Sequence, residues 1–162
     1  MPPPPPDVRT SSKKYSLSDV RDPVVHLTND AVQIKHAAYG AIEPGNKLSP
    51  GQFAELLDAQ CPGRGAMVEA LIEPRMKDLV AVTLDAVKGT MNGNSRPRCF
   101  ELFGYDFMCD EELGVWLIEV NSNPCLELSS PMLEKTVPAM LEHVFQLAVD
   151  PVFPPPAFEV PR

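Results

Sequence analysis

The chain has 162 residues, 44% of them hydrophobic, so it fits one domain or a large part of one and can build a core. Its formal net charge of -8 excludes the basic stripe of a nucleic-acid-binding protein and makes this chain alone a poor docking surface for an acidic partner. No apolar run approaches the roughly 20 residues of a membrane span, and the N-terminal MPPPPPDVRT has no apolar signal-peptide core.

The prolines indicate where the domain begins and ends, and the cysteines indicate the redox state of the chain. Many of the nineteen prolines lie near the ends, which predicts proline-rich tails at 1–7 and 151–162 around a domain of residues 8–150. The four cysteines show no C-x-x-C pair and no metal-ligand spacing, and we interpret them as reduced thiols of a cytosolic protein. They are Cys61, Cys99, Cys109 and Cys125.

The first predicted elements are a strand and a short helix. The segment DPVVHLTND, residues 22–30, has a short β-branched run that becomes polar, which suits a strand that ends at a working surface. Ser49 and Pro50 are typical of an N-cap followed by the first helical position. Since Phe53, Leu56 and Leu57 share one helical face, a helix is predicted over 50–59.

Two longer helices follow. Apolar residues from Met76 to Val87 recur at helical spacing, which predicts a helix over 74–88. Ser130 and Pro131 begin another helix over 131–149, in which Pro138 is expected to produce a kink or a restart. Its core-facing residues are predicted to be Leu141, Val144, Phe145 and Ala148.

Between these helices, residues 100–109 and 115–121 are rich in aromatic and β-branched residues and flank the turn DEELG, which predicts a β-hairpin. If Glu112 and Leu113 form its tip, Asp106 lies directly opposite Glu119. Asn121 points to the same face as Glu119, so the three side chains converge within roughly 5–8 Å at the Cβ level. The opposite face is predicted to supply the core through Tyr105, Phe107, Ile118 and Val120, and Trp116 is also assigned to the core.

Two carboxylates placed across a strand pair repel each other unless a cation or a shared proton neutralises them. Two carboxylates and an amide are hard oxygen ligands that suit Mg²⁺. Periodicity alone leaves three interpretations open: a solvent-exposed polar face of an edge hairpin, a metal site, and a proton-sharing acid–base pair.

Several segments of the sequence resemble the motifs of a known protein family. FELFGYDFMCDEELGVWLIEVNSNPCLE resembles the C-terminal signature of the tubulin tyrosine ligase family, which are ATP-grasp enzymes that join an amino acid to a tubulin tail. RTSSKKY, HLTND, YGAIEPGN and SNPCLELSSPMLEKTVPAM recur in the family's order, so the resemblance covers nearly all of residues 7–156. It implies an α+β fold, the C-terminal half of an ATP-grasp domain, with an antiparallel sheet flanked by helices.

The resemblance also implies roles for particular residues. Asp106, Glu119 and Asn121 match the family's Mg²⁺ ligands, which hold the cations that bridge the ATP phosphates. Arg9 matches an arginine near the amino-acid substrate and the transferred phosphate, and is the candidate catalytic residue. The nucleotide and substrate side is matched by His26, Thr28 and Asn29. Without the family, Arg9 is an ordinary solvated charge and His26 an ordinary structural histidine; His36 and His143 are interpreted as structural.

The resemblance therefore predicts an ATP- and Mg²⁺-dependent ligase of tubulin, cytoplasmic, microtubule-associated and monomeric. RTSS around Arg9 favours tyrosine as the added amino acid, whereas NSNPCLELSSP is closer to glutamate- and glycine-adding relatives. Full-length ligases carry upstream lysines that hold the ATP phosphates, and none precedes Arg9. We therefore expect a partial chain with essentially no activity alone; a polyglutamylase and an inactive, partner-binding remnant are the alternatives.

Overall fold

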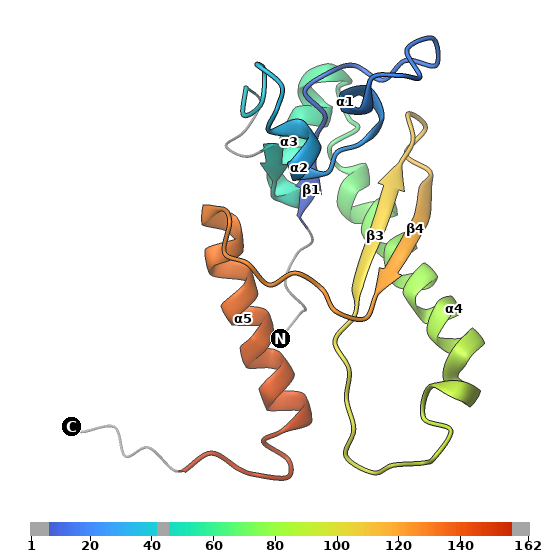
Figure 1. The fold of residues 1–162 in the computed structure, drawn as a ribbon, viewed down its shortest axis with the longest axis vertical. Helices are drawn as coiled ribbons and strands as arrows, with labels where there is room; N and C mark the ends of the chain where they lie inside the picture. Colours follow the sequence, from blue (N-terminus) through green and yellow to red (C-terminus); the bar gives the residue numbers. More distant parts are fainter. Residues whose placement is uncertain (1–6, 42–45, 157–162) are drawn as a thin grey trace, which may run out of the picture. The chain divides into compact units, whose positions relative to one another are not determined.

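A computed structural model describes residues 7–41 and 46–156, so of the predicted tails at 1–7 and 151–162, residues 1–6 and 157–162 lie outside the described residues. The chain divides into two compact units. Within the described residues, the N-terminal unit comprises 7–41, 46–74 and 129–132, and the hairpin unit comprises 75–128 and 133–156. Figure 1 shows the elements of each unit, and each unit is described by itself.

Short elements make up the N-terminal unit. β1 (Val8–Arg9) pairs antiparallel with β2 (Lys47–Leu48), and three α-helices and one π-helix accompany them. These helices are α1 (Pro23–His26), α2 (Asp30–Gln33), α3 (Pro50–Gln60) and the π-helix η2 (Val68–Ile72).

The strand predicted over 22–30 is wrong, because this segment forms α1 and the start of α2. The carboxylate of Asp22 accepts a hydrogen bond from the Val24 N–H at 2.9 Å, and Pro23 occupies the first helical turn. An acidic cap followed by proline is a helix-start signal, and here it outweighs the β-branched pair that suggested a strand.

The helix predicted over 50–59 is confirmed as α3. Ser49 accepts from the Gln52 N–H at 3.3 Å, and the Gln52 side chain accepts from the Ser49 N–H at 2.8 Å, which completes a capping box. The face predicted to be apolar is half-buried in the structure, at Phe53, Leu56 and Leu57. Local capping and periodicity thus determine this helix together.

The hairpin unit contains most of α4 (Glu73–Met91), the strands β3 (Gly104–Cys109) and β4 (Val115–Asn121), and most of α5 (Pro131–Ala148). Both predicted long helices are confirmed, and α5 runs through Pro138 without interruption. The α+β class is confirmed as well, although each antiparallel sheet among the described residues has only two strands. The ATP-grasp half-domain stays a prediction.

A β-bulge divides the hairpin into two registers. Asp106 pairs with Glu119, whereas its neighbour Phe107 pairs with Leu117, so Ile118 is the extra residue of β4. The last pair is Cys109 with Val115, so the turn spans residues 110–114 rather than the predicted two-residue tip. Leu117, and not Ile118, therefore joins the face of Phe107.

The buried apolar side chains of the described residues are few and belong to both units. They are Val25, Leu48, Val68, Ile72, Leu113, Val115 and Val137. Four residues predicted for the core are instead exposed: Trp116 at 63%, Ile118 at 56%, Phe145 at 50% and Val120 at 42%. Ile118 leaves the core because of the bulge, whereas Phe145 lies at the edge of the half-buried stripe of α5.

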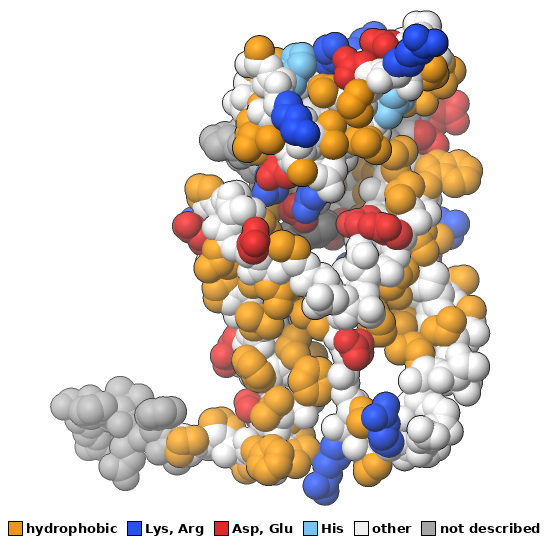
Figure 2. Space-filling view, viewed as in Figure 1, with side chains coloured by type: hydrophobic (Ala, Val, Ile, Leu, Met, Phe, Trp, Pro, Cys, Tyr) orange, Lys and Arg blue, Asp and Glu red, His pale blue; other side chains and the backbone are white. Residues whose placement is uncertain are grey.

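Apolar side chains also occupy much of the surface visible in Figure 2. All four cysteines are free thiols in the structure. Among the described residues, no helix has the length and apolar character needed to cross a membrane.

Candidate metal-binding site

The acidic pair of the hairpin is placed by strand pairing. Asp106 in β3 and Glu119 in β4 are register partners, as the sequence predicts, so their side chains leave the sheet on the same face. Both residues are exposed, which leaves their carboxylates accessible to a ligand from solvent.

Asn121 completes the cluster. Its amide Nδ2 lies 3.3 Å from Oδ2 of Asp106 and 3.2 Å from Oε1 of Glu119, and it donates a hydrogen bond to each. The three predicted side chains therefore meet around one point, where the amide N–H of Asn121 lies between the two negatively charged carboxylates. Rotating the amide by half a turn would present Oδ1 to that point, giving two carboxylates and a carbonyl oxygen.

This donor set fits a hard divalent cation. Mg²⁺ is commonly held by one or two carboxylates and completes its shell with water and substrate phosphates. Within the described residues, no group of three or more His, Cys, Asp or Glu side chains is arranged to hold a metal, so the amide is needed as the third ligand here. The role of the three residues as metal ligands stays a prediction.

The turn that joins the strands is organised by Asp110. Its carboxylate accepts hydrogen bonds from the N–H groups of Glu112 at 3.0 Å and Gly114 at 2.7 Å, and from the Trp116 indole at 2.8 Å. The bond from Trp116 is the main reason that the pKa of Asp110 lies below its ordinary value. Leu113 has a φ of 66°, and a Cβ on Gly114 would lie 2.6 Å from Oδ2 of Asp110. This turn therefore needs its glycine.

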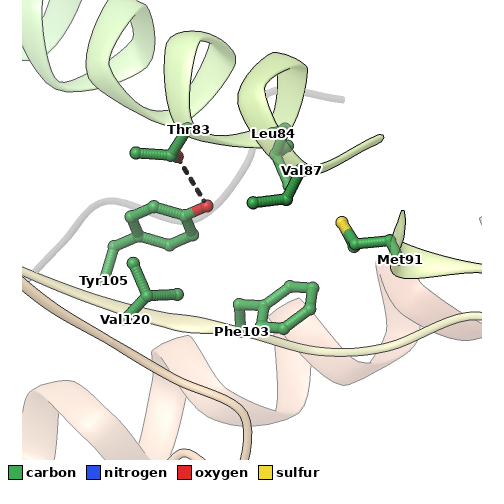
Figure 3. Close-up of a pocket in the computed structure, with 7 residues that line it drawn as sticks. All are labelled: Thr83, Leu84, Val87, Met91, Phe103, Tyr105 and Val120. Carbon is green, nitrogen blue, oxygen red and sulfur yellow. Dashed lines mark hydrogen bonds between the residues drawn. The ribbon is translucent and has the colours of Figure 1, made fainter. Parts of the chain in front are cut away.

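The opposite face of the hairpin is apolar and lies against α4. Tyr105 donates to or accepts from the Thr83 hydroxyl at 3.0 Å, and its ring stacks with Phe107 at a centroid distance of 6.0 Å. Figure 3 shows the resulting pocket of about 330 Å³ between α4 and the strands. It is lined by Thr83, Leu84, Val87, Met91, Phe103, Tyr105 and Val120. The hairpin thus has one packing face and one acidic face.

The other predicted site residues belong to the N-terminal unit. Arg9 is exposed in β1 and pairs with Asp7 at 3.3 Å. His26 ends α1, where Nε2 lies 2.8 Å from the Asp19 carbonyl oxygen and the ring meets Tyr15 edge-on at 5.4 Å.

Thr28 and Asn29 lie between α1 and α2, and both are exposed. The Asn29 side chain caps α2 by accepting from the Ala31 N–H at 2.9 Å. Asn29 therefore has a structural role whatever its part in binding, and the substrate roles of Arg9, His26, Thr28 and Asn29 stay predictions.

Sequence reasoning missed an ion pair in the same unit that joins a buried lysine to a partly exposed aspartate. Lys47, whose side chain is 4% exposed, binds Oδ2 of Asp30 at 3.3 Å and Oγ of Ser129 at 3.0 Å, while the Tyr39 hydroxyl donates to Oδ1 of Asp30 at 2.7 Å. Burial by itself would raise the pKa of Asp30, but the bonds from Tyr39 and Lys47 outweigh it and hold that pKa below its ordinary value. No local pattern marks Lys47, because its partner Ser129 lies 82 positions away.

The acidic face of the hairpin thus carries two carboxylates and an amide, a donor set that suits a divalent cation. A sequence model of the Tubulin-tyrosine ligase family matches residues 7–157, and the chain belongs to this family.

Several relatives extend the match. The chain is 32% identical to tubulin glycylase 3B of Tetrahymena thermophila over 143 residues, which is 88% of this chain and 12% of that protein. It is 32% identical to the protein monoglycylase TTLL8 of Homo sapiens over 147 residues, 88% of this chain and 17% of the relative. The probable tubulin polyglutamylase ttll-9 of Caenorhabditis elegans is 36% identical over 123 residues, 75% of this chain and 28% of the relative. The chain thus spans 12–28% of the length of these relatives.

Proposed function

We propose that the protein is an ATP- and Mg²⁺-dependent ligase that adds amino acids, glycine first among them, to tubulin. The observation that carries this proposal is the convergence of Asp106, Glu119 and Asn121 on the open face of the hairpin in a chain of this family. The amino acid is chosen from the relatives, several of which are named as glycylases. This choice replaces the tyrosine favoured by RTSS, because no relative reported above is named as a tyrosine ligase.

The chemistry explains why such a site is needed. A carboxylate must be activated before an amine can form an amide bond with it, and phosphoryl transfer from ATP provides this activation. Phosphoryl transfer depends on charge neutralisation and positioning rather than on covalent help from the protein. Mg²⁺ held by the acidic face would supply the neutralising charge, with Asp106 and Glu119 as anionic ligands and Asn121 as the neutral one.

Residues of the N-terminal unit have the chemistry to bind the remaining groups. The guanidinium of Arg9 suits a phosphate or a carboxylate, because its planar donors match two oxygens at once. Thr28 and Asn29 are exposed polar side chains that can hydrogen-bond a substrate, and His26 supports the segment from the end of α1. A cytoplasmic location on microtubules follows if tubulin is the substrate.

Glutamate is the second candidate for the added amino acid. It is favoured by the 36% and 34% identities to probable tubulin polyglutamylases of Caenorhabditis elegans and Mus musculus. An inactive member of the family is the remaining alternative.

The test is to express the complete coding sequence with tubulin and to identify the added residues by mass spectrometry of the tubulin tails. Glycine is the expected addition. Glu119→Gln should abolish it, because the lost charge faces a cation rather than the core. The matched control is Glu101→Gln, an exposed glutamate of the same unit, which should leave ligation unchanged. Unmodified tubulin, or equal ligation by both variants, would contradict the proposal.

A further inference from the structure

Gln33, the last residue of α2, is fully buried among the described residues of the N-terminal unit. Its Oε1 accepts a hydrogen bond from the Ser12 N–H at 2.8 Å. Its Nε2 donates to the carbonyl oxygens of Val24 at 2.9 Å and Leu27 at 2.5 Å, and lies 3.4 Å from Oγ of Ser11. One side chain thus ties residues 11–12 to residues 24–27.

These two segments carry all four residues to which we assign substrate or nucleotide contacts in this unit. Ser11 and Ser12 follow the Arg9 strand after one residue, Thr10. Val24 and Leu27 belong to α1 and its C-cap, beside His26 and the Thr28–Asn29 turn. The Ser11 hydroxyl adds a second tie, since it donates to the Val24 carbonyl oxygen at 2.7 Å.

The first segment is also held from its other side by Asn46, which is 3% exposed. Its Nδ2 donates to the Thr10 carbonyl oxygen at 3.2 Å and to Oγ of Ser12 at 3.0 Å, while its Oδ1 accepts from the Gly40 N–H at 2.8 Å. Two buried amides therefore fix residues 10–12. Gln33 connects that segment to α1 as well, alongside the bond from the Ser11 hydroxyl and the ion pair of Lys13 with Asp22.

We propose that Gln33 is a positioning residue of the ligase, which sets the Arg9 segment and the segment of His26, Thr28 and Asn29 in one fixed arrangement. The inference rests on the proposed function. A buried amide whose hydrogen bonds are satisfied fixes geometry more strictly than an apolar side chain, because any shift breaks several bonds in a low-dielectric interior. Displacing a substrate-positioning group by about 1 Å lowers a rate by about 100-fold.

The first arm of the test is hydrogen exchange in the 162-residue chain. Gln33→Met keeps the volume of the side chain but removes every hydrogen bond, so exchange of the Ser12 amide should accelerate at least tenfold. Ser11→Ala is a milder variant that removes the second tie, and it serves if Gln33→Met does not fold. Ser49→Ala is the matched control, because it loses a helix cap of the same unit but touches neither segment.

The second arm is steady-state kinetics of ligation in the protein expressed from its complete coding sequence, at a temperature well below unfolding. Gln33→Met should lower kcat/KM for the amino acid by about 100-fold. Ser11→Ala should lower it by about tenfold, whereas Ser49→Ala should stay within about twofold of the unmodified protein.

The arms separate the two hypotheses. If the unmodified protein ligates, two results would overturn the positioning role. One is a Ser12 amide that exchanges as slowly in Gln33→Met as in the unmodified chain. The other is a Ser12 amide that exchanges faster while kcat/KM of Gln33→Met stays as high as that of Ser49→Ala. An unmodified protein that ligates nothing would overturn the proposed function, and it would be recognised without any variant.

Discussion

Removing one carboxylate from the acidic hairpin face should change the response to Mg²⁺ far more than the stability of the free chain. In Glu119→Gln the side-chain carbonyl can still accept from Asn121, so the geometry of the cluster is kept while one charge is lost. Two unit charges about 5 Å apart repel by about 0.8 kcal/mol in water, and physiological salt reduces this to about 0.4 kcal/mol. Without Mg²⁺ the variant should therefore be equally stable or slightly more stable.

The opposite holds when Mg²⁺ is present. A ligand that binds only the folded chain stabilises it by about 1.4 kcal/mol when its free concentration is ten times Kd. For a chain of this size, that corresponds to a rise in melting temperature of about 3–6 °C. The unmodified chain should show this rise, and Glu119→Gln should lose most of it because the remaining ligand set has a single anion.

Trp116 provides the assay, since it is the single tryptophan of the chain and lies in β4 itself. Thermal unfolding followed by tryptophan fluorescence, with MgCl₂ compared against NaCl at equal ionic strength, reports on the hairpin directly. Glu101→Gln should keep the full Mg²⁺ response. Equal stabilisation of the unmodified chain and Glu119→Gln would refute the metal site, and so would the absence of any specific Mg²⁺ effect on the unmodified chain.

Two further predictions concern the scaffold. The bond from Trp116 lowers the pKa of Asp110 in the folded chain, so the stability from this bond is fully present above the ordinary aspartate pKa and is lost as the pH falls through the lower folded value. A fluorescence titration of the native chain should therefore show an acid midpoint below pH 3.8. A midpoint above that value would contradict the bond. Leu48→Ala should lower the free energy of unfolding by about 2–5 kcal/mol because Leu48 is buried, whereas Leu17→Ala, at an exposed position, should change it by less than about 0.5 kcal/mol. Chemical denaturation measures both changes. Equal losses would show that Leu48 is not part of the core.

Elements with strong local signals were predictable from the sequence. The capping pair Ser49–Gln52 and the apolar face of α3 lie within a few residues of one another, so the helix could be located without tertiary information. The facing of Asp106 and Glu119 was also predictable, although the assumed tip was wrong. Cys109 pairs with Val115 rather than with Trp116, so the turn beyond Cys109 has one residue fewer than the assumed register leaves, and the bulge at Ile118 takes up the difference.

The remaining features depend on contacts that the sequence does not display. Trp116 was assigned to the core on hydrophobicity, but the Asp110 carboxylate binds its indole at the surface. Gln33 and Lys47 give no local signal, since their meaning comes from partners up to 22 and 82 positions away. The helix at 23–26 was missed because a four-residue element is decided by its cap rather than by periodicity.

Because of the bulge, the length of the turn can change without changing which face of the hairpin the acidic side chains occupy. In a regular hairpin, gaining or losing one residue near the tip would rotate every later side chain of the strand to the other face. Here the turn-side pairs, 107–109 with 115–117, are registered separately from the pairs 104–106 with 119–121. A one-residue change in DEELG can therefore be absorbed where the registers meet, and the carboxylates of Asp106 and Glu119 keep facing each other while the tip diversifies.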